Sequence, residues 1–203
     1  MPIMSLKQRL RSLFPKLYRW LWLAKKHLKE RVLKDPWAHY YEDRFTEPEP
    51  WLAAIQLPTY VDTILDIGCG NGRNFIPFEG RLRLWGIDIV PERRITWTRP
   101  FQDLRYQQKT LEELTHELEK GGTDLSRTLV FTSGTMMYAT RKNQQRLYRS
   151  CQASGCRNFI FHEHPETSQK HSLENFKLPR EWFDVKKMRT DDSEVLAFMH
   201  LEP

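Results

Sequence analysis

Three glycines at alternate positions and two aspartates give this chain its clearest chemical signal. Gly68, Gly70 and Gly72 follow an apolar run that we expect to be a buried strand. Glycines there let the chain turn sharply and bring bare backbone against a ligand. Asp66 lies two residues before the first glycine, and Asp88 ends the next apolar run, where its carboxylate can accept hydrogen bonds from two ribose hydroxyls. The pattern predicts a site for a nucleotide cofactor.

The spacing of the glycines indicates which nucleotide fits. A dinucleotide site carries G-x-G-x-x-G, in which the third glycine packs the helix on the strand and the helix N-terminus faces a pyrophosphate. Here the spacing is G-x-G-x-G, and Asp66 places a carboxylate near a ligand cation instead. S-adenosylmethionine has an ammonium, a sulfonium and a ribose but no phosphate, so it suits this pattern.

Residues 66–72, together with Asp88, resemble the cofactor site of the class I S-adenosylmethionine-dependent methyltransferases, and the match covers residues 60 to about 203. The resemblance implies S-adenosylmethionine as the cofactor. Two other interpretations stay open, namely a glycine turn that binds nothing and a nicotinamide or flavin site. The candidate cofactor contacts are Asp66, Gly68, Gly70, Gly72, Asp88, Ile89, Thr110, Leu111, Ser133 and Arg44.

Three of these contacts depend on the resemblance for their roles. Ile89 would offer an apolar face to adenine. Many relatives place an aspartate after the third strand, whereas this chain has Thr110, whose hydroxyl could still accept from the adenine amino group. Arg44 belongs to an aromatic segment, 37–45, that closes over the cofactor in many relatives. The alternative is that this segment packs its aromatic side chains on the core.

Alternating strands and helices are predicted along the rest of the chain, which indicates an α/β fold with a doubly wound, mostly parallel sheet. The resemblance adds a count of seven strands and a C-terminal antiparallel hairpin. Strands are expected near 62–67, 83–88, 103–108, 128–133, 157–162, 183–189 and 194–201, and helices from 71 and over 91–97, 111–120 and 141–153.

The ends of the fourth and fifth strands are where the methyl acceptor should lie. Tyr138, with two preceding methionines, would either wall a pocket for a small acceptor or belong to the core. His162 and His164 project to one face if the fifth strand persists, and an imidazole there could act as general base. Alternatively, both are satisfied polar residues at a strand end, or they bind a divalent metal with Glu163. We predict no metal site.

Residues 1–34 form a separate basic arm. They contain ten Lys and Arg against one Glu, a net charge of +9 in a chain of +6, so the remainder carries −3. Apolar residues recur at intervals of three and four, which predicts an amphipathic helix interrupted at Pro15. Such a helix could dock on its own domain, lie on an anionic membrane surface or bind a partner helix or nucleic acid. We expect domains at 1–34 (arm), 35–59 (cap and linker) and 60–203 (core).

Composition limits the remaining possibilities. A hydrophobic content of 39% supports a packed core. Three cysteines, an odd number, indicate a reduced cytoplasmic protein, at the inner face of a membrane if the arm binds lipid. No apolar stretch reaches transmembrane length, and the stretch 17–24, which Arg19 interrupts, makes a poor signal peptide.

These observations predict a methyltransferase acting on an oxygen or nitrogen of a small-molecule or glycan-like acceptor. The end of the fourth strand lacks the acid or amide, the prolines and the aromatic residue of enzymes that methylate DNA bases, so a nucleic-acid partner is disfavoured. One rival is a methyltransferase-like module without catalysis. Another is an RNA methyltransferase that recruits its substrate through the arm, which would show as a steep salt dependence of RNA binding.

Overall fold

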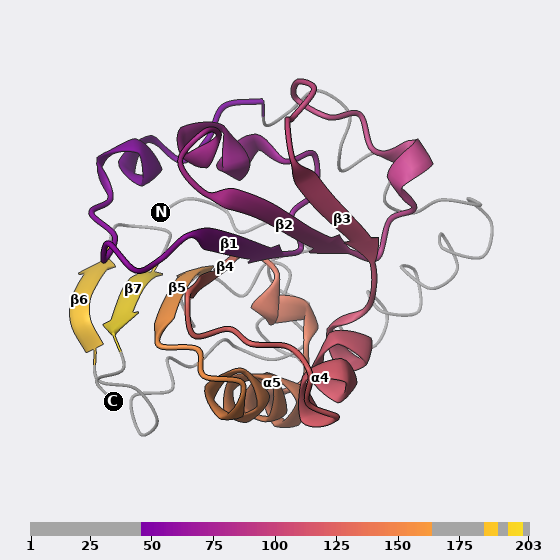
Figure 1. Cartoon of the computed structure of the whole chain (residues 1–203), viewed down its shortest axis with the longest axis vertical. Helices are drawn as coiled ribbons and strands as arrows, with labels where there is room; N and C mark the ends of the chain where they lie inside the picture. Colours follow the sequence, from indigo (N-terminus) through magenta and orange to yellow (C-terminus); the bar gives the residue numbers. More distant parts are fainter. Residues whose placement is uncertain (1–45, 164–184, 191–194, 201–203) are drawn as a thin grey trace, which may run out of the picture. The chain divides into compact units, whose positions relative to one another are not determined.

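The computed structural model describes residues 46–163 and the backbones of residues 185–190 and 195–200. Its centre is a sheet in the order β3-β2-β1-β4-β5-β7-β6 (Figure 1). All neighbouring pairs among the first five strands are parallel, which confirms the predicted α/β class. These five strands are β1 (Thr63–Ile67), β2 (Arg83–Asp88), β3 (Leu104–Gln108), β4 (Thr128–Ser133) and β5 (Asn158–Glu163).

Two further strands continue the sheet beyond β5. β7 (Val195–His200) pairs antiparallel with β5, and β6 (Val185–Thr190) pairs antiparallel with β7. The connection between them, residues 191–194, lies outside the described residues, so the predicted hairpin stays a prediction. The arm of residues 1–34 also lies outside them.

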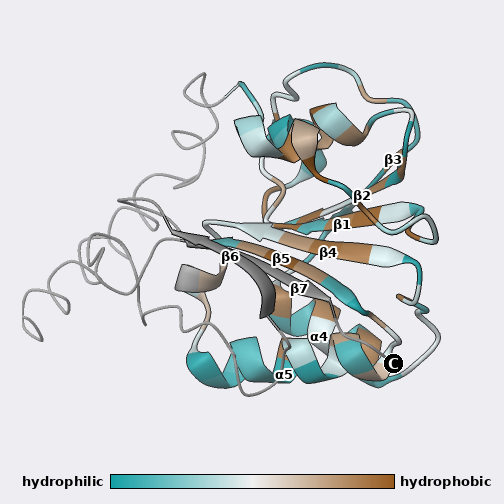
Figure 2. Ribbon diagram, turned by 90° about the vertical axis from the view of Figure 1, so that its left-hand side faces the viewer, coloured by the Kyte–Doolittle hydropathy of each residue, from teal (hydrophilic) through white to brown (hydrophobic). Residues whose placement is uncertain are grey.

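Residues 46–163 contain two α-helices, α4 (Leu111–Glu119) and α5 (Arg141–Ala153), which cover the same face of the sheet (Figures 1 and 2). Each begins at a threonine whose hydroxyl accepts a backbone N–H at the helix start, from Glu113 after Thr110 and from Asn143 after Thr140. Their apolar sides pack on the sheet, and their polar sides face outward, as Figure 2 shows. The core on this face includes Leu65, Val130, Leu114, Leu118, Leu147, Tyr148, Phe159 and Phe161.

Short 3₁₀ helices cover the other face, where a doubly wound sheet would carry α-helices. They are η1 (Pro50–Ala54) and η2 (Arg73–Phe78); a third, η3 (Glu92–Arg94), follows β2, has no buried residue and is all that forms of the helix expected over 91–97. The helix expected from residue 71 is therefore a six-residue 3₁₀ helix that begins at Arg73. Pro77 has no N–H to donate and disfavours a continuing α-helix, and Gly80 then turns the chain with φ +74°.

A second apolar core holds these short elements on the sheet. Leu52 of η1 and both phenylalanines of η2, Phe75 and Phe78, have no exposed surface. Burying a side chain of this size stabilises the fold by about 1.5–3 kcal/mol relative to leaving it exposed. From the strands, Ile64, Leu84, Leu129, Phe131 and Ile160 complete the cluster. The glycine loop between β1 and η2 is thus anchored on both sides by buried residues.

The parallel strands bring the predicted chemistry to one edge of the sheet. Ser133 at the end of β4 pairs with His162 in β5, and Thr132 beside it pairs with Ile67, the last residue of β1. Ligands of open parallel sheets bind at this carboxyl edge. No helix among residues 46–163 has the length and apolar character needed to cross a membrane.

Candidate active site

The three motif glycines form a tight loop at the carboxyl end of β1. Gly68, Gly70 and Gly72 have φ values of +79°, +54° and +78°, a region that other residues rarely adopt. The loop is held against β2, because the backbone amides of Gly68 and Cys69 both donate to the carbonyl oxygen of Ile87, at 2.7 and 3.2 Å. The predicted sharp turn is therefore present.

Two of these glycines make room for side chains of the chain itself. A Cβ added at Gly68 would lie 2.1 Å from Oγ1 of Thr135, which follows β4. A Cβ added at Gly72 would lie 2.8 Å from the ring of Phe101 and 3.0 Å from that of Trp97. The sequence interpretation, in which the glycines bring backbone against a ligand, is therefore incomplete, since internal packing also requires Gly68 and Gly72.

Asp88 joins the end of β2 to the glycine loop. Its side chain accepts a hydrogen bond from the backbone amide of Gly70 at 2.9 Å and another from that of Val90 at 3.1 Å. The residue is only 5% exposed. A carboxylate has about four lone-pair positions and can accept several hydrogen bonds at once. This is the arrangement that a ribose-binding acid needs.

Tyr106 of β3 supports the backbone around Asp88. Its hydroxyl donates to the carbonyl oxygens of Asp88, at 3.3 Å, and of Val90. Burial, with a further contribution from the charge of Asp88, raises the pKa of the Tyr106 phenol far above its ordinary value. The phenol therefore stays protonated and remains a donor at physiological pH.

Asp66 lies at the end of β1 with 1% of its surface exposed. The thiol of Cys69 is buried nearby, and its pKa is raised chiefly by burial and further by the charges of Asp66 and Asp88. Two carboxylates thus flank the glycine loop. Their negative field suits a ligand that carries positive charge.

Ile89 and Thr110, the two residues expected at the adenine ring, differ in how far their side chains are open to a ligand. Ile89 is 42% exposed, the one large hydrophobic side chain so exposed among the described residues. The Thr110 hydroxyl instead accepts a hydrogen bond from the backbone amide of Glu113 at 3.1 Å. In return, the Glu113 carboxylate accepts one from the backbone amide of Thr110 at 2.8 Å. This capping box gives Thr110 a structural role that the sequence interpretation did not include. Leu111 is partly buried and packs on the core beneath α4.

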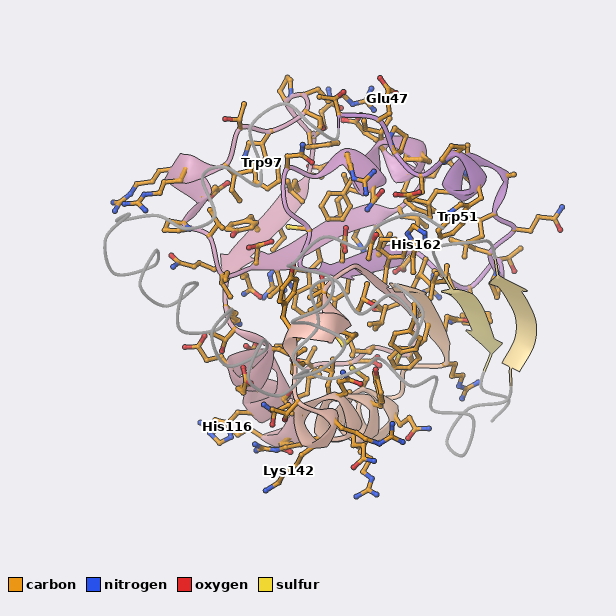
Figure 3. All side chains as sticks on the ribbon, turned by 180° about the vertical axis from the view of Figure 1, so that it is seen from behind. Glu47, Trp51, Trp97, His116, Lys142 and His162 are labelled. Atoms are coloured by element: carbon orange, nitrogen blue, oxygen red, sulfur yellow. The ribbon has the colours of Figure 1, made fainter. Side chains whose placement is uncertain are left out.

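A buried polar cluster lies beyond the ends of β4 and β5. Nδ1 of His162 is 3.1 Å from Oγ of Ser133 and 3.9 Å from Oε1 of Glu49. Trp51 meets the His162 ring edge to face at a centroid distance of 5.4 Å, and Figure 3 shows these two side chains next to each other. Arg73 donates to Glu49 at 2.8 Å and so closes the cluster toward the glycine loop.

Other predicted acceptor-side residues are distributed differently. Met136 is fully buried in the core beneath α5, while Tyr138 is half-buried in η4 (Met136–Tyr138). Arg44 and His164 lie outside the described residues, so the structure brings only His162 of the predicted histidine pair into the site. Within the described residues, no group of three or more His, Cys, Asp and Glu side chains is arranged to hold a metal ion.

Five residues described at this site were not predicted: Glu49, Trp51, Arg73, Tyr106 and Thr135. The segment Glu47-Pro48-Glu49-Pro50 lies in the predicted cap and linker, 35–59, and its charges had no assigned role. No pattern in the sequence placed this segment at the carboxyl edge of the sheet. The partners of Glu49 are 24 and 113 residues away in the chain, so local spacing could not reveal them.

This chain is similar to known proteins in structure, whereas the sequence comparisons found no match. No family model matches it, and no curated protein matches it. The structure of a LepI variant in complex with SAH and a substrate analogue aligns with 90% of this chain, with a TM-score of 0.57 and 10% identity. This chain spans 55% of that LepI chain.

Two bacterial proteins give similar alignments. The match with an S-adenosylmethionine-dependent methyltransferase from Mesorhizobium loti covers 74% of this chain and 96% of that protein, with a TM-score of 0.54 and 16% identity. The match with an O-methyltransferase family protein from Burkholderia thailandensis covers 98% of this chain and 64% of that protein, with a TM-score of 0.53 and 11% identity. The structural alignments show a shared fold, and at identities this low they show the fold alone.

Proposed function

We propose that this chain, which has the fold of the class I S-adenosylmethionine-dependent methyltransferases, binds S-adenosylmethionine and transfers its methyl group to an oxygen or nitrogen of a small-molecule or glycan-like acceptor. The bound cofactor would supply a methyl group already activated by a sulfonium. The protein then has to bind both reactants, align them and, for a hydroxyl acceptor, remove a proton.

The hydrogen bond between Asp88 and Gly70 is the observation that carries this proposal. It places a buried carboxylate directly against the middle glycine of the loop. In this fold a ribose lies between these two elements, and a carboxylate such as that of Asp88 accepts hydrogen bonds from ribose hydroxyls. Asp66 and the exposed face of Ile89 would serve the cationic end and the adenine ring.

The acceptor side is proposed to lie at the ends of β4 and β5. Ser133 neighbours the glycine loop in the sheet, and His162 contacts Ser133, so an imidazole stands close to where a methyl group would be presented. We propose His162 as the general base, with Tyr138 as a further acceptor contact. His164 and Arg44 stay candidates for the acceptor and the cofactor, respectively. The seven-stranded sheet with its terminal hairpin is part of the same proposal.

The arm of residues 1–34 is proposed to hold the protein on an anionic membrane surface, at the cytoplasmic face. Its support is the sequence alone, namely the net charge of +9 and the apolar stripe. An acceptor at or near a membrane surface would be consistent with this placement.

Cofactor binding by calorimetry tests the proposal. We expect micromolar affinity for S-adenosylmethionine and S-adenosylhomocysteine and thermal stabilisation by both. Gly70→Val should abolish binding, because the new side chain projects from the loop that has to contact the ligand. Gly121→Val is the matched control, since Gly121 also has a positive φ (+76°) but nothing lies within 4 Å of an added Cβ.

The two variants give a clear decision. Unchanged affinity in Gly70→Val would contradict the assignment of the loop. Turnover of labelled methyl donor with a panel of hydroxyl and amine acceptors then defines the acceptor atom. Firm cofactor binding without turnover of any acceptor would favour the non-catalytic module.

A further inference from the structure

Glu49 lies where the segment before the core crosses the carboxyl edge of the sheet. It precedes η1, and its carboxylate comes within 3.9 Å of Nδ1 of His162. The backbone amide of Glu49 donates to Oδ1 of Asn74 at 3.4 Å, which ties the segment to η2. This residue therefore joins three parts of the chain that are distant in sequence.

Arg73 fixes the position of the Glu49 carboxylate. One guanidinium nitrogen donates to Oε1 of Glu49 at 2.8 Å, and the other donates to the carbonyl oxygen of Glu47 at 3.0 Å. Both charged side chains are largely buried, at 21% and 18% exposed. Reduced contact with water strengthens the pair relative to one on the surface.

The Glu49 carboxylate lies close enough to His162 to bias which ring nitrogen carries the proton. An ionised carboxylate is only an acceptor, so it favours the form of the neutral imidazole with the proton on the nearer nitrogen, Nδ1. Oγ of Ser133, 3.1 Å from Nδ1, can then accept that proton in a hydrogen bond. The lone pair of the imidazole is left on Nε2.

Packing holds the ring in the plane that this arrangement needs. The Trp51 ring meets it at an interplanar angle of 72°, and Trp51 also packs on Phe131 of β4. Since Trp51 is two residues after Glu49, one short segment supplies both the charge and the packing surface for His162.

We propose that Glu49, held by Arg73, is a positioning residue that sets the tautomer of His162 with the proton on Nδ1, so that Nε2 is the nitrogen that accepts a proton from the methyl acceptor. The inference rests on the proposed function for the identity of that acceptor. The tautomer itself is a property of the protein alone, so it can be measured whether or not the methyl-transfer assignment is correct.

Nitrogen NMR of the full-length protein with ¹⁵N-labelled histidine tests this proposal. The signal of His162 is assigned by its loss in His162→Gln, and spectra are recorded at rising alkaline pH until they no longer change. We expect the wild-type protein to show a protonated Nδ1 and an unprotonated Nε2. Glu49→Gln, which removes the charge, should give a mixture of the two tautomers or the opposite one.

Glu47→Gln is the matched control. It is the same change two residues away, at a residue whose backbone carbonyl and not its side chain contacts Arg73. It should leave the His162 spectrum unchanged. If Glu49→Gln does not fold, Glu49→Asp replaces it, since a carboxylate that is one carbon shorter should give a partial change in the same direction.

The outcomes separate this inference from the proposed function. A wild-type proton on Nε2, or a tautomer unaffected by either Glu49 variant, overturns the positioning role even if S-adenosylhomocysteine binds normally. If the tautomer shifts as expected but calorimetry finds no binding of S-adenosylhomocysteine, the positioning role stands and the proposed function fails.

Turnover gives a second readout once an acceptor is known. Glu49→Gln should lower kcat by a factor up to the roughly 10²–10⁴ that general-base catalysis contributes, with cofactor affinity unchanged. A purely structural role would instead reduce cofactor affinity and thermal stability together and leave kcat per folded molecule unchanged.

Discussion

The carboxylate of Asp88 accepts a hydrogen bond from the backbone amide of Gly70 at 2.9 Å, so the acid at the end of β2 holds the glycine loop at the end of β1. The other carboxylate oxygen of Asp88 accepts a hydrogen bond from the backbone amide of Val90. The residue that is expected to bind a ribose therefore also organises the loop before any ligand arrives. Loss of this side chain should affect both stability and binding.

We expect Asp88→Asn to weaken cofactor binding and to lower the melting temperature. A carboxamide has one oxygen, so either the Gly70 or the Val90 amide would face an NH₂ group. One buried amide without an acceptor costs about 1–3 kcal/mol. Calorimetry and thermal unfolding measure the two effects.

Asp103→Asn is the control for this change. Asp103 is an exposed residue with φ +56°, a conformation that asparagine also tolerates. It should leave both quantities near wild type. Equal behaviour of the two variants would mean that Asp88 neither holds the loop nor contacts the cofactor.

Gly68→Ala should be far more destabilising than Gly80→Ala. Both glycines have φ values in the left-handed region, +79° and +74°, so both changes cost about 1–2 kcal/mol in backbone strain. An added Cβ meets nothing within 4 Å at Gly80, but it lies 2.1 Å from Oγ1 of Thr135 at Gly68. The difference between the two melting temperatures isolates the contact with Thr135.

A second substitution shows whether Thr135 causes that difference. Thr135→Ala removes the two nearest atoms, at 2.1 and 2.7 Å, and should restore part of the stability lost in Gly68→Ala. Additive losses in the double variant would show that the two positions do not interact.

Local sequence patterns predicted the five parallel strands and two of the four core helices, α4 and α5, closely because those elements depend on nearby residues. β2, β4 and α5 begin and end at the predicted residues, and the threonine caps explain where α4 and α5 begin. The helix after the glycine loop is shorter than expected because Pro77 disrupts it. Side-chain clusters depend instead on which distant segments meet. The contact of Glu49 with His162 arises from the crossing of a segment over the sheet edge, which periodicity does not encode.

Asp62 should contribute stability that depends on pH. Its oxygens accept from Arg83 at 2.7 Å, from Arg127 at 2.8 Å and from the Thr63 hydroxyl at 2.8 Å, and these bonds hold its pKa well below the ordinary value of 3.8. Since the folded pKa is lowered, the contribution is complete above the ordinary value and is lost as the pH falls below it.

We therefore expect Asp62→Asn to be less stable than the wild type at neutral pH, with the difference disappearing under acidic conditions. The Asp62 side chain is 35% exposed, so each ion pair contributes no more than about 0.2–1 kcal/mol. Chemical denaturation at a series of pH values measures the difference. A gap that persists unchanged below the ordinary pKa would show that the ion pairs are not its cause.

The arm should bind anionic bilayers through its charge and apolar stripe. We expect the full chain to float with liposomes that contain anionic lipid and a truncated chain beginning at Asp35 to remain unbound. Binding should weaken as salt is raised, because surface charges are screened. If both chains float equally, or if neither floats, the arm has another role, such as docking on the core.

His162→Ala should reduce turnover by about two to four orders of magnitude with cofactor affinity near normal, since general-base catalysis contributes that much. The control is His116→Ala, because His116 is exposed on the outer side of α4, away from the site (Figure 3).

A double variant that also replaces His164 tests whether the second histidine substitutes for the first. A role in metal binding would appear instead as loss of activity with a chelator and recovery with added divalent ion. Full activity of the double variant at neutral pH, unaffected by chelator, would exclude both roles. Catalysis would then rest on the alignment of an acceptor that is nucleophilic enough to need no base.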